Sequence, residues 1–226
     1  MMKRIVRLTV SLVLSLVLMM PLLGTGEVFA AGKPGKASLP DRVIVKLYNN
    51  KLAVRNVNKP KYATSVRFYL KANAKYIKTV KKGSKAYKKY RRNKKKYILK
   101  KSGKKYKVYR KIKGAKWKKI NMIDDGSWDQ LTYVYQTQLG FNKQYMFRCR
   151  GVNDSGAGSY SKTLTFYTQS KAQYKSIKSK FNKDKAQLDP EDEYHLLLEA
   201  LQDEYSDFVY MYDDEIPNED DYPYEE

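Results

Sequence analysis

The side chains best suited by type and spacing to a chemical role lie between residues 87 and 97. Segment 81–105 carries 14 Lys or Arg side chains in 25 residues, with tyrosines set among them. Dense positive charge attracts polyanions, and aromatic faces stack on sugars and on nucleic-acid bases. Lys predominates over Arg and binds as a hydrated point charge, so we expect charge-driven contacts of low sequence specificity. The candidate binding residues are Tyr87, Lys88, Lys89, Tyr90, Arg91, Arg92, Lys94, Lys95, Lys96 and Tyr97.

Residue patterns for catalysis, metal binding or cofactor binding are missing from the sequence. His195 is the only histidine and Cys149 the only cysteine, which excludes zinc spacing and leaves no Cys/His or Ser/His/Asp set. Asp124, Asp125 and Asp129 cluster near a predicted turn. Paired carboxylates hydrolyse glycosides, but three of them in a Gly-Ser loop are more typical of a turn. We therefore expect no enzyme, no cofactor and no metal site.

The charge of the chain changes sign near residue 189. The whole chain has 46 basic and 23 acidic side chains, a net charge of +23. Residues 189–226 hold 16 of the acidic side chains and no Lys or Arg. A basic body with an acidic tail indicates a polyanionic partner, internal charge neutralisation, or both.

Residues 1–30 have the three-part layout of a secretory signal peptide of bacterial type. Cations within the first seven residues precede an uncharged run from Leu8 to Gly26, and small residues end at Ala30. We expect cleavage after Ala30, a secreted or cell-surface protein, and no stable membrane span after cleavage. The alternative is an uncleaved anchor, because the uncharged run is nearly long enough to cross a bilayer.

Strand patterns fill residues 41–168, after a linker at residues 31–40. From Tyr145, inward-facing Tyr145, Phe147 and Cys149 alternate with polar or flexible residues, which predicts a half-buried strand. A turn cluster follows, and Thr163–Thr168 predicts the second strand of a hairpin. The earlier strand candidates are Val43–Tyr48, Leu52–Val57, Thr64–Lys71, Tyr106–Ile112, Lys116–Ile120 as hairpin partner of 106–112, and Leu131–Leu139.

The stretch Leu139–Ser161 resembles the last two strands of a fibronectin type III domain. The matching residues are Leu139, Tyr145, Val152-Asn153, Gly156-Ala157-Gly158 and Ser161. The resemblance implies an immunoglobulin-like β-sandwich in which Tyr145 is the tyrosine corner, with its ring in the core and its hydroxyl bonded to upstream backbone. The family carries a Trp two residues after a Leu in an early strand. In this chain the residue two positions after Leu52 is Val54, so that Trp is absent.

The predicted sandwich is longer than its family requires. Leu39–Thr168 holds about 130 residues, whereas such a sandwich takes roughly 100. The surplus predicts an insertion or an elongated hairpin near residues 81–105. Both Thr64–Lys71 and Tyr106–Ile112 match the third strand of the family, which leaves open whether the basic segment is a protruding loop or part of the sheet.

Cys149 falls on the inward face of the Tyr145 strand. The chain has no second cysteine, so it forms no internal disulfide. We expect a small buried hydrophobic residue; the alternative is a reactive thiol or an intermolecular bridge.

Helical patterns replace the strands after Thr168, and residues 169–212 form the predicted helical extension. The spacing of Tyr174, Ile177, Phe181 and Leu188 predicts a basic helix. A second helix is expected with Asp189 as its cap and Pro190 at its first position. Residues 213–226 are acidic and contain prolines, which predicts disorder in isolation. The apolar stripe of the second helix, interpreted as a partner-docking face, is Tyr194, Leu197, Leu198, Leu201, Tyr205 and Phe208.

We therefore expect a secreted, mainly β, non-enzymatic protein that attaches to an anionic polymer or glycan of the cell surface through its Lys/Tyr-rich face. Non-specific binding of nucleic acid follows from the same charge. The alternative is a protein-interaction module whose acidic tail docks a basic partner or the domain's own basic face, where the tail would compete with polyanions. A solvated surface that only confers solubility remains a third interpretation.

Overall fold

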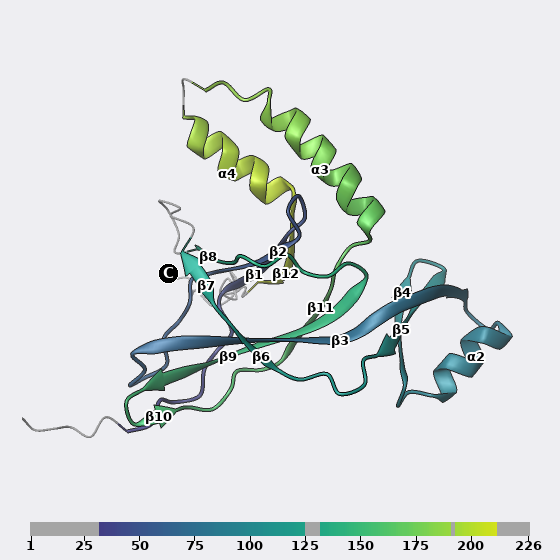
Figure 1. Ribbon diagram of the computed structural model, residues 1–226, viewed down its shortest axis with the longest axis horizontal. Coiled ribbons are helices and arrows are strands. Elements are labelled where there is room, and N and C mark those ends of the chain that lie inside the picture. Colours follow the sequence, from purple (N-terminus) through teal and green to yellow (C-terminus); the bar gives the residue numbers. More distant parts are fainter. Residues whose placement is uncertain (1–31, 125–131, 191–192, 212–226) are drawn as a thin grey trace, which may run out of the picture. The chain divides into compact units, whose positions relative to one another are not determined.

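The structure is a computed structural model that describes residues 32–124, 132–190 and 193–211 (Figure 1). The signal peptide expected at residues 1–30 and the acidic segment 213–226 lie outside these residues, as do Asp125 and Asp129. Within the described part of the chain, no helix is both long and apolar enough to cross a membrane.

The protein is mainly β, with two antiparallel sheets. One sheet has the order β12 (Ser206–Met211), β1 (Arg42–Lys46), β2 (Lys51–Arg55), β8 (Thr132–Tyr135) and β7 (Met122–Asp124). The other has the order β10 (Gly156–Ala157), β9 (Lys143–Asn153), β3 (Ser65–Lys81), β5 (Lys105–Lys111) and β4 (Tyr97–Ser102), with β11 (Leu164–Tyr167) beside β9 and β6 (Lys118–Ile120) beside β3. We call them the five-stranded and the seven-stranded sheet.

A single hydrophobic cluster joins the two sheets. Val43 and Leu52 of the five-stranded sheet belong to the same buried cluster as Phe68, Phe147 and Phe166 of the seven-stranded sheet. Alternate residues of a strand point to opposite faces. Strands β3 and β9 bury one face in this core, whereas β1 and β2 are buried on both faces, one in this core and the other in a second cluster formed by Ile44, Ala53 and Val134. Burial of large apolar side chains such as these is the main stabilising contribution to the fold.

The predicted hairpin after Leu139 is confirmed. β9 and β11 pair antiparallel, with Phe147 opposite Leu164. The Tyr145 ring is buried, and its hydroxyl oxygen accepts a hydrogen bond of 2.8 Å from the Gly140 N–H. Gly158 is required because a Cβ there would collide with the backbone carbonyl of Pro34.

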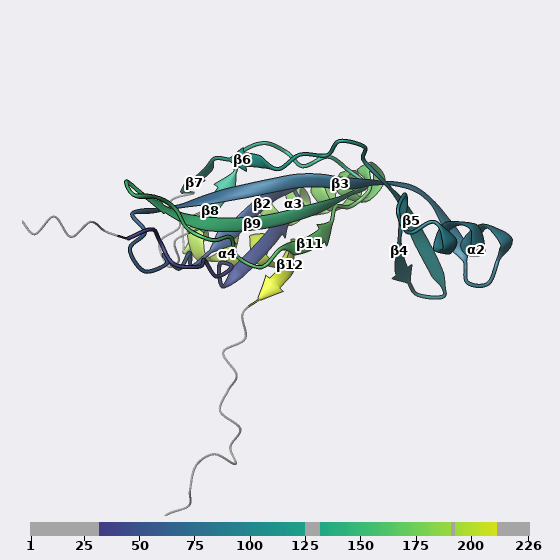
Figure 2. The ribbon, with the colours of Figure 1, turned by 90° about the horizontal axis from the view of Figure 1, so that it is seen from below.

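Strand β3 links the core to the basic segment. Its residues Ser65–Lys75 pair with β9, and its residues Ala74–Lys81 pair with β5. Both candidates for the third strand therefore lie in one sheet. The basic segment between them forms helix α2 (Lys85–Arg92) and strand β4, so it is part of the sheet and not a loop (Figures 1 and 2).

The expected pairing of Lys116–Ile120 with Tyr106–Ile112 is wrong. β5 pairs instead with β4, and β6 pairs with β3, where Ile120 lies opposite Phe68. Ile120 is only 5% exposed and belongs to the shared core. Beside β5 it would lie outside that core, so burial of Ile120 favours the pairing with β3.

The C-terminal region contains helices α3 (Lys171–Lys185) and α4 (Tyr194–Glu204) and strand β12. The basic helix is confirmed as α3, which Ser170 caps. The second helix differs from the prediction: Glu193, not Asp189, is its N-cap, with φ +42°, and Ser206–Met211 leave the helix to form β12. The open edge of β1 offers backbone hydrogen-bond partners to these residues, and strand pairing there ends the helix at Glu204.

Candidate polyanion-binding site

Helix α2 presents the densest group of cations and is fixed at both ends. At its start, the Ser84 side chain accepts a hydrogen bond from the Tyr87 N–H, 3.1 Å long. At its end, the Asn93 N–H donates to the Tyr90 carbonyl over 3.2 Å. Capping of this kind satisfies backbone groups that a short helix otherwise leaves open.

The tyrosines of the predicted site hold α2 on the sheet. The Tyr87 ring lies 4.9 Å from that of Tyr106, and the Tyr90 ring lies 4.8 Å from that of Tyr97. All four rings are half-buried. We expected Tyr87, Tyr90 and Tyr97 to stack on a ligand; the structure instead has them contacting one another and β5, so they position the helix.

The cations of the predicted site are exposed. In the described residues none of them forms an ion pair with a carboxylate. Lys89, Arg91 and Arg92 occupy the last turn, where the helix dipole favours positive charge. The exposed cations of the site are Lys88, Lys89, Arg91, Arg92, Lys94, Lys95 and Lys96.

A polar cavity of about 290 Å³ lies where β4 and β5 approach the start of α3. Lys100, Lys101 and Lys107 line it, together with Asp207 of β12. The Lys100 ammonium lies 4.1 Å from the centre of the Tyr167 ring. Burial lowers the pKa of Lys100, while Asp207 acts to raise it and Lys107 to lower it. The sequence pattern gave no sign of this cavity, because its walls come from segments far apart in the chain.

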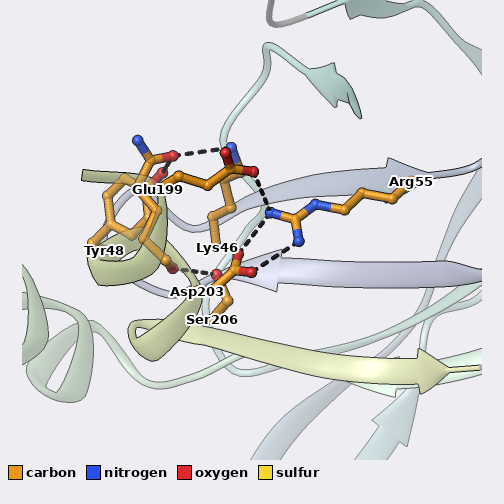
Figure 3. A network of polar contacts seen from close by, with 7 residues as sticks. Lys46, Tyr48, Arg55, Glu199, Asp203 and Ser206 are labelled. Carbon is orange, nitrogen blue, oxygen red and sulfur yellow. Dashed lines mark hydrogen bonds and ion pairs between the residues drawn. The ribbon is translucent and has the colours of Figure 1, made fainter. Parts of the chain in front are cut away.

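The described part of the acidic tail docks on the five-stranded sheet (Figure 3). The Arg55 guanidinium donates to both carboxylate oxygens of Asp203, at 2.8 and 2.7 Å, and lies 3.5 Å from Glu199. Tyr48 donates to the Gln202 side chain over 2.9 Å. Arg55 was not predicted to be functional, and its β-strand context gives no signal for the role.

The six residues of the predicted docking stripe do not form one helix face. Tyr205 is buried, with its ring 5.6 Å from that of Phe181, and Phe208 lies in β12 against the buried Ile44 cluster. Both are therefore used inside the protein. Leu197 is 44% exposed and its neighbour Leu196 is 40% exposed, whereas Tyr194, Leu198 and Leu201 are half-buried.

Cys149 is a core residue, as predicted, with 1% of its surface exposed. Burial raises the pKa of its thiol, and the Ser161 side chain opposes this effect. We expect a disulfide reagent such as DTNB to modify Cys149 at least about a hundredfold more slowly in the native protein than in urea, because the reagent reaches the buried sulfur only when the core opens. Rapid native reaction, followed by absorbance, would contradict this assignment.

In the described ranges no three His, Cys, Asp or Glu side chains lie close enough together to hold a metal ion.

Comparison with known proteins identifies no family. No family model matches the chain, and no curated protein matches it. Eight chains of solved structures match. One, described as "Myokine structure", is 12% identical, covers 59% of this chain and 98% of its own, and has a TM-score of 0.27. A TM-score this low supports no conclusion about this protein.

Proposed function

We propose that this is a secreted, non-enzymatic protein with a fibronectin type III-like sandwich that attaches to anionic polymers of the cell surface. The shared core of two antiparallel sheets and the Tyr145–Gly140 hydrogen bond support the sandwich. A scaffold of this kind does not determine function, so the binding proposal depends on α2.

The observation that carries the binding proposal is the set of exposed cations on and after α2. None has a carboxylate partner in the described residues, and the mutual repulsion of such closely spaced cations favours binding of a polyanion. The ring contacts of Tyr87 with Tyr106 and of Tyr90 with Tyr97 hold α2 and the turn after it beside the sheet, which keeps these charges together. Contact with a polyanion releases counterions, which makes binding strong at low salt and weak at high salt.

Replacement of Lys88, Lys89, Lys94 and Lys95 by Gln is expected to weaken binding to polyphosphate by at least about tenfold at low salt. The slope of log affinity against log salt should fall by about one for each lysine that contacts the polymer. Fluorescence anisotropy with labelled polyphosphate measures both quantities.

The matched control makes the same Lys-to-Gln change at four exposed lysines of α3 and so removes the same charge. These are Lys175, Lys178, Lys183 and Lys185. We expect a much smaller loss of affinity and an almost unchanged slope. Equal losses in the two variants would show that net charge alone drives binding and would refute the assignment of the site to α2.

A second candidate function is protein binding through α4. Exposed Leu196 and Leu197 favour it, because a helix that served only as an ion-pair partner of Arg55 would not need leucines toward solvent. Salt separates the two functions: an apolar contact of α4 persists in salt that releases a polymer from α2.

A further inference from the structure

The outer face of the seven-stranded sheet carries a second group of cations. Phe68 and Cys149 point into the core, so their neighbours along β3 and β9 point outward. The two strands are in register there: Arg67 lies opposite Arg150, and Tyr69 lies opposite Arg148. These four side chains therefore share one outward patch.

Aromatic rings and guanidinium groups alternate in this patch. The guanidinium carbon of Arg148 lies 4.1 Å from the Trp117 ring centre and 3.5 Å from that of Tyr160. That of Arg150 lies 4.7 Å from the Tyr160 ring centre and 5.2 Å from that of Tyr69. Tyr160 thus lies within cation–π range of both arginines and joins them into one stack.

The stack holds positive charge without a matching carboxylate. Like charges directly opposite on neighbouring strands destabilise a sheet, as Arg67 and Arg150 must do here. None of Arg67, Arg148 and Arg150 forms an ion pair in the described residues, and the buried Arg148 Nε has no hydrogen-bond partner there. Ring stacking occupies guanidinium faces and not their N–H edges; the Arg150 Nε donates to the Tyr69 hydroxyl over 3.1 Å, which fixes that guanidinium and leaves its terminal nitrogens to face a ligand.

The residue type also matters, because this chain uses Lys for most of its positive charge. Arg differs from Lys in its planar fork of N–H donors, which binds oxyanions with two parallel hydrogen bonds and stacks on aromatic rings. Arginines on adjacent strands suit an oxyanion with more than two oxygens, such as a phosphate or sulfate ester, better than a carboxylate.

We propose that Arg67, Arg148 and Arg150 form a second anion site that binds phosphate or sulfate groups of a polymer through their guanidinium forks, with those of Arg148 and Arg150 held by Tyr69, Trp117 and Tyr160. This site is separate from the lysines of α2 and does not depend on them. Binding at this site depends on the planar fork of N–H donors as well as on charge, so replacement of Arg by Lys should weaken it even though the charge is kept.

The decisive variant is Arg148→Lys with Arg150→Lys, which keeps the charge and removes the forks. We expect the affinity of this variant for polyphosphate and for dextran sulfate to fall about tenfold. The unmodified protein should bind poly-glutamate more weakly than it binds polyphosphate or dextran sulfate. Arg42→Lys with Arg110→Lys is the matched control, with affinity unchanged within about twofold. Unchanged affinity of the R148K/R150K protein would overturn the proposal, and poly-glutamate binding as tight as polyphosphate would overturn the choice of ligand.

Two further measurements separate binding from folding and from α2. Arg67 is exposed and its guanidinium lies over no ring of the described residues, so Arg67→Lys should retain the melting temperature and still lose about threefold in affinity. In a Trp128→Phe background Trp117 is the only tryptophan, and its emission should change on saturation with polyphosphate. Both effects should persist after the four α2 lysines are replaced by Gln; their loss in that background would show that a separate site does not exist.

Discussion

Asp203→Ala is expected to lower the free energy of unfolding by about 3 kcal/mol, whereas Arg55→Met should lower it by only about 1 kcal/mol. The asymmetry follows from burial: the Arg55 side chain is 5% exposed and that of Asp203 is 33% exposed. Removal of Asp203 leaves a buried guanidinium without its bidentate partner. Removal of Arg55 leaves carboxylates that water can reach.

Urea unfolding of the two single variants and the double variant measures this difference. The double variant should be about as stable as Arg55→Met alone, because the buried guanidinium that Asp203 compensates is no longer present. Glu199→Gln is the matched control and should cost less than about 1 kcal/mol, since Glu199 is the more distant partner, at 3.5 Å. Simple additivity of the Arg55 and Asp203 effects would contradict the coupling.

Truncation after Glu204 is expected to destabilise the protein by about 4 kcal/mol or more. The truncation removes Tyr205, which is buried against Phe181, and Phe208, which covers the cluster of Ile44, Ala53 and Val134. Loss of one large buried aromatic residue typically costs 3–5 kcal/mol. The truncation also uncovers the edge of β1, and an open strand edge promotes association between chains. Urea unfolding and size-exclusion chromatography over a concentration series measure the two effects.

The matched control ends the chain after Met211 and keeps all of β12. It removes only residues outside the described part of the chain, and we expect native stability and no association. A large loss of stability in this control would show that β12 is not the stabilising element. The same truncation after Met211 can test whether the acidic residues 213–226 compete with polymers for the basic surface. A deletion of residues 189–226 is unsuitable for that test, because it would also remove α4 and β12.

The described part of the acidic tail contributes to the fold itself. β12 completes the five-stranded sheet, and α4 supplies both carboxylates that neutralise Arg55. Within the described residues, the tail contacts β1 and β2 and not the cations of α2. Charge complementarity drew attention to the lysines, but in the part of the chain that the structure describes the ion pairs form at buried Arg55, where desolvation makes them necessary.

The Tyr145 hydrogen bond was expected from the resemblance to fibronectin type III domains, whereas local pattern was sufficient to predict most strands, helix α3 and the burial of Cys149. Each depends on alternation or spacing within a few residues, and the side chain's place in the core follows from that period. The cations of α2 were also evident, because charge density is a property of composition. The helix that carries them was not, since its tyrosines need the rings of β4 and β5 to pack against.

Only the tertiary structure decided which segments meet. Ile120 pairs β6 with β3 because the shared core is there, and Ser206–Met211 leave the expected helix because β1 has an open edge. The arginine stack of β3 and β9 arises from register between strands about eighty residues apart in sequence. Sequence alone determined the faces and the charges of the elements, because these depend on neighbouring residues; long-range burial and strand pairing determined the partners of those faces, because they depend on residues that only folding brings together.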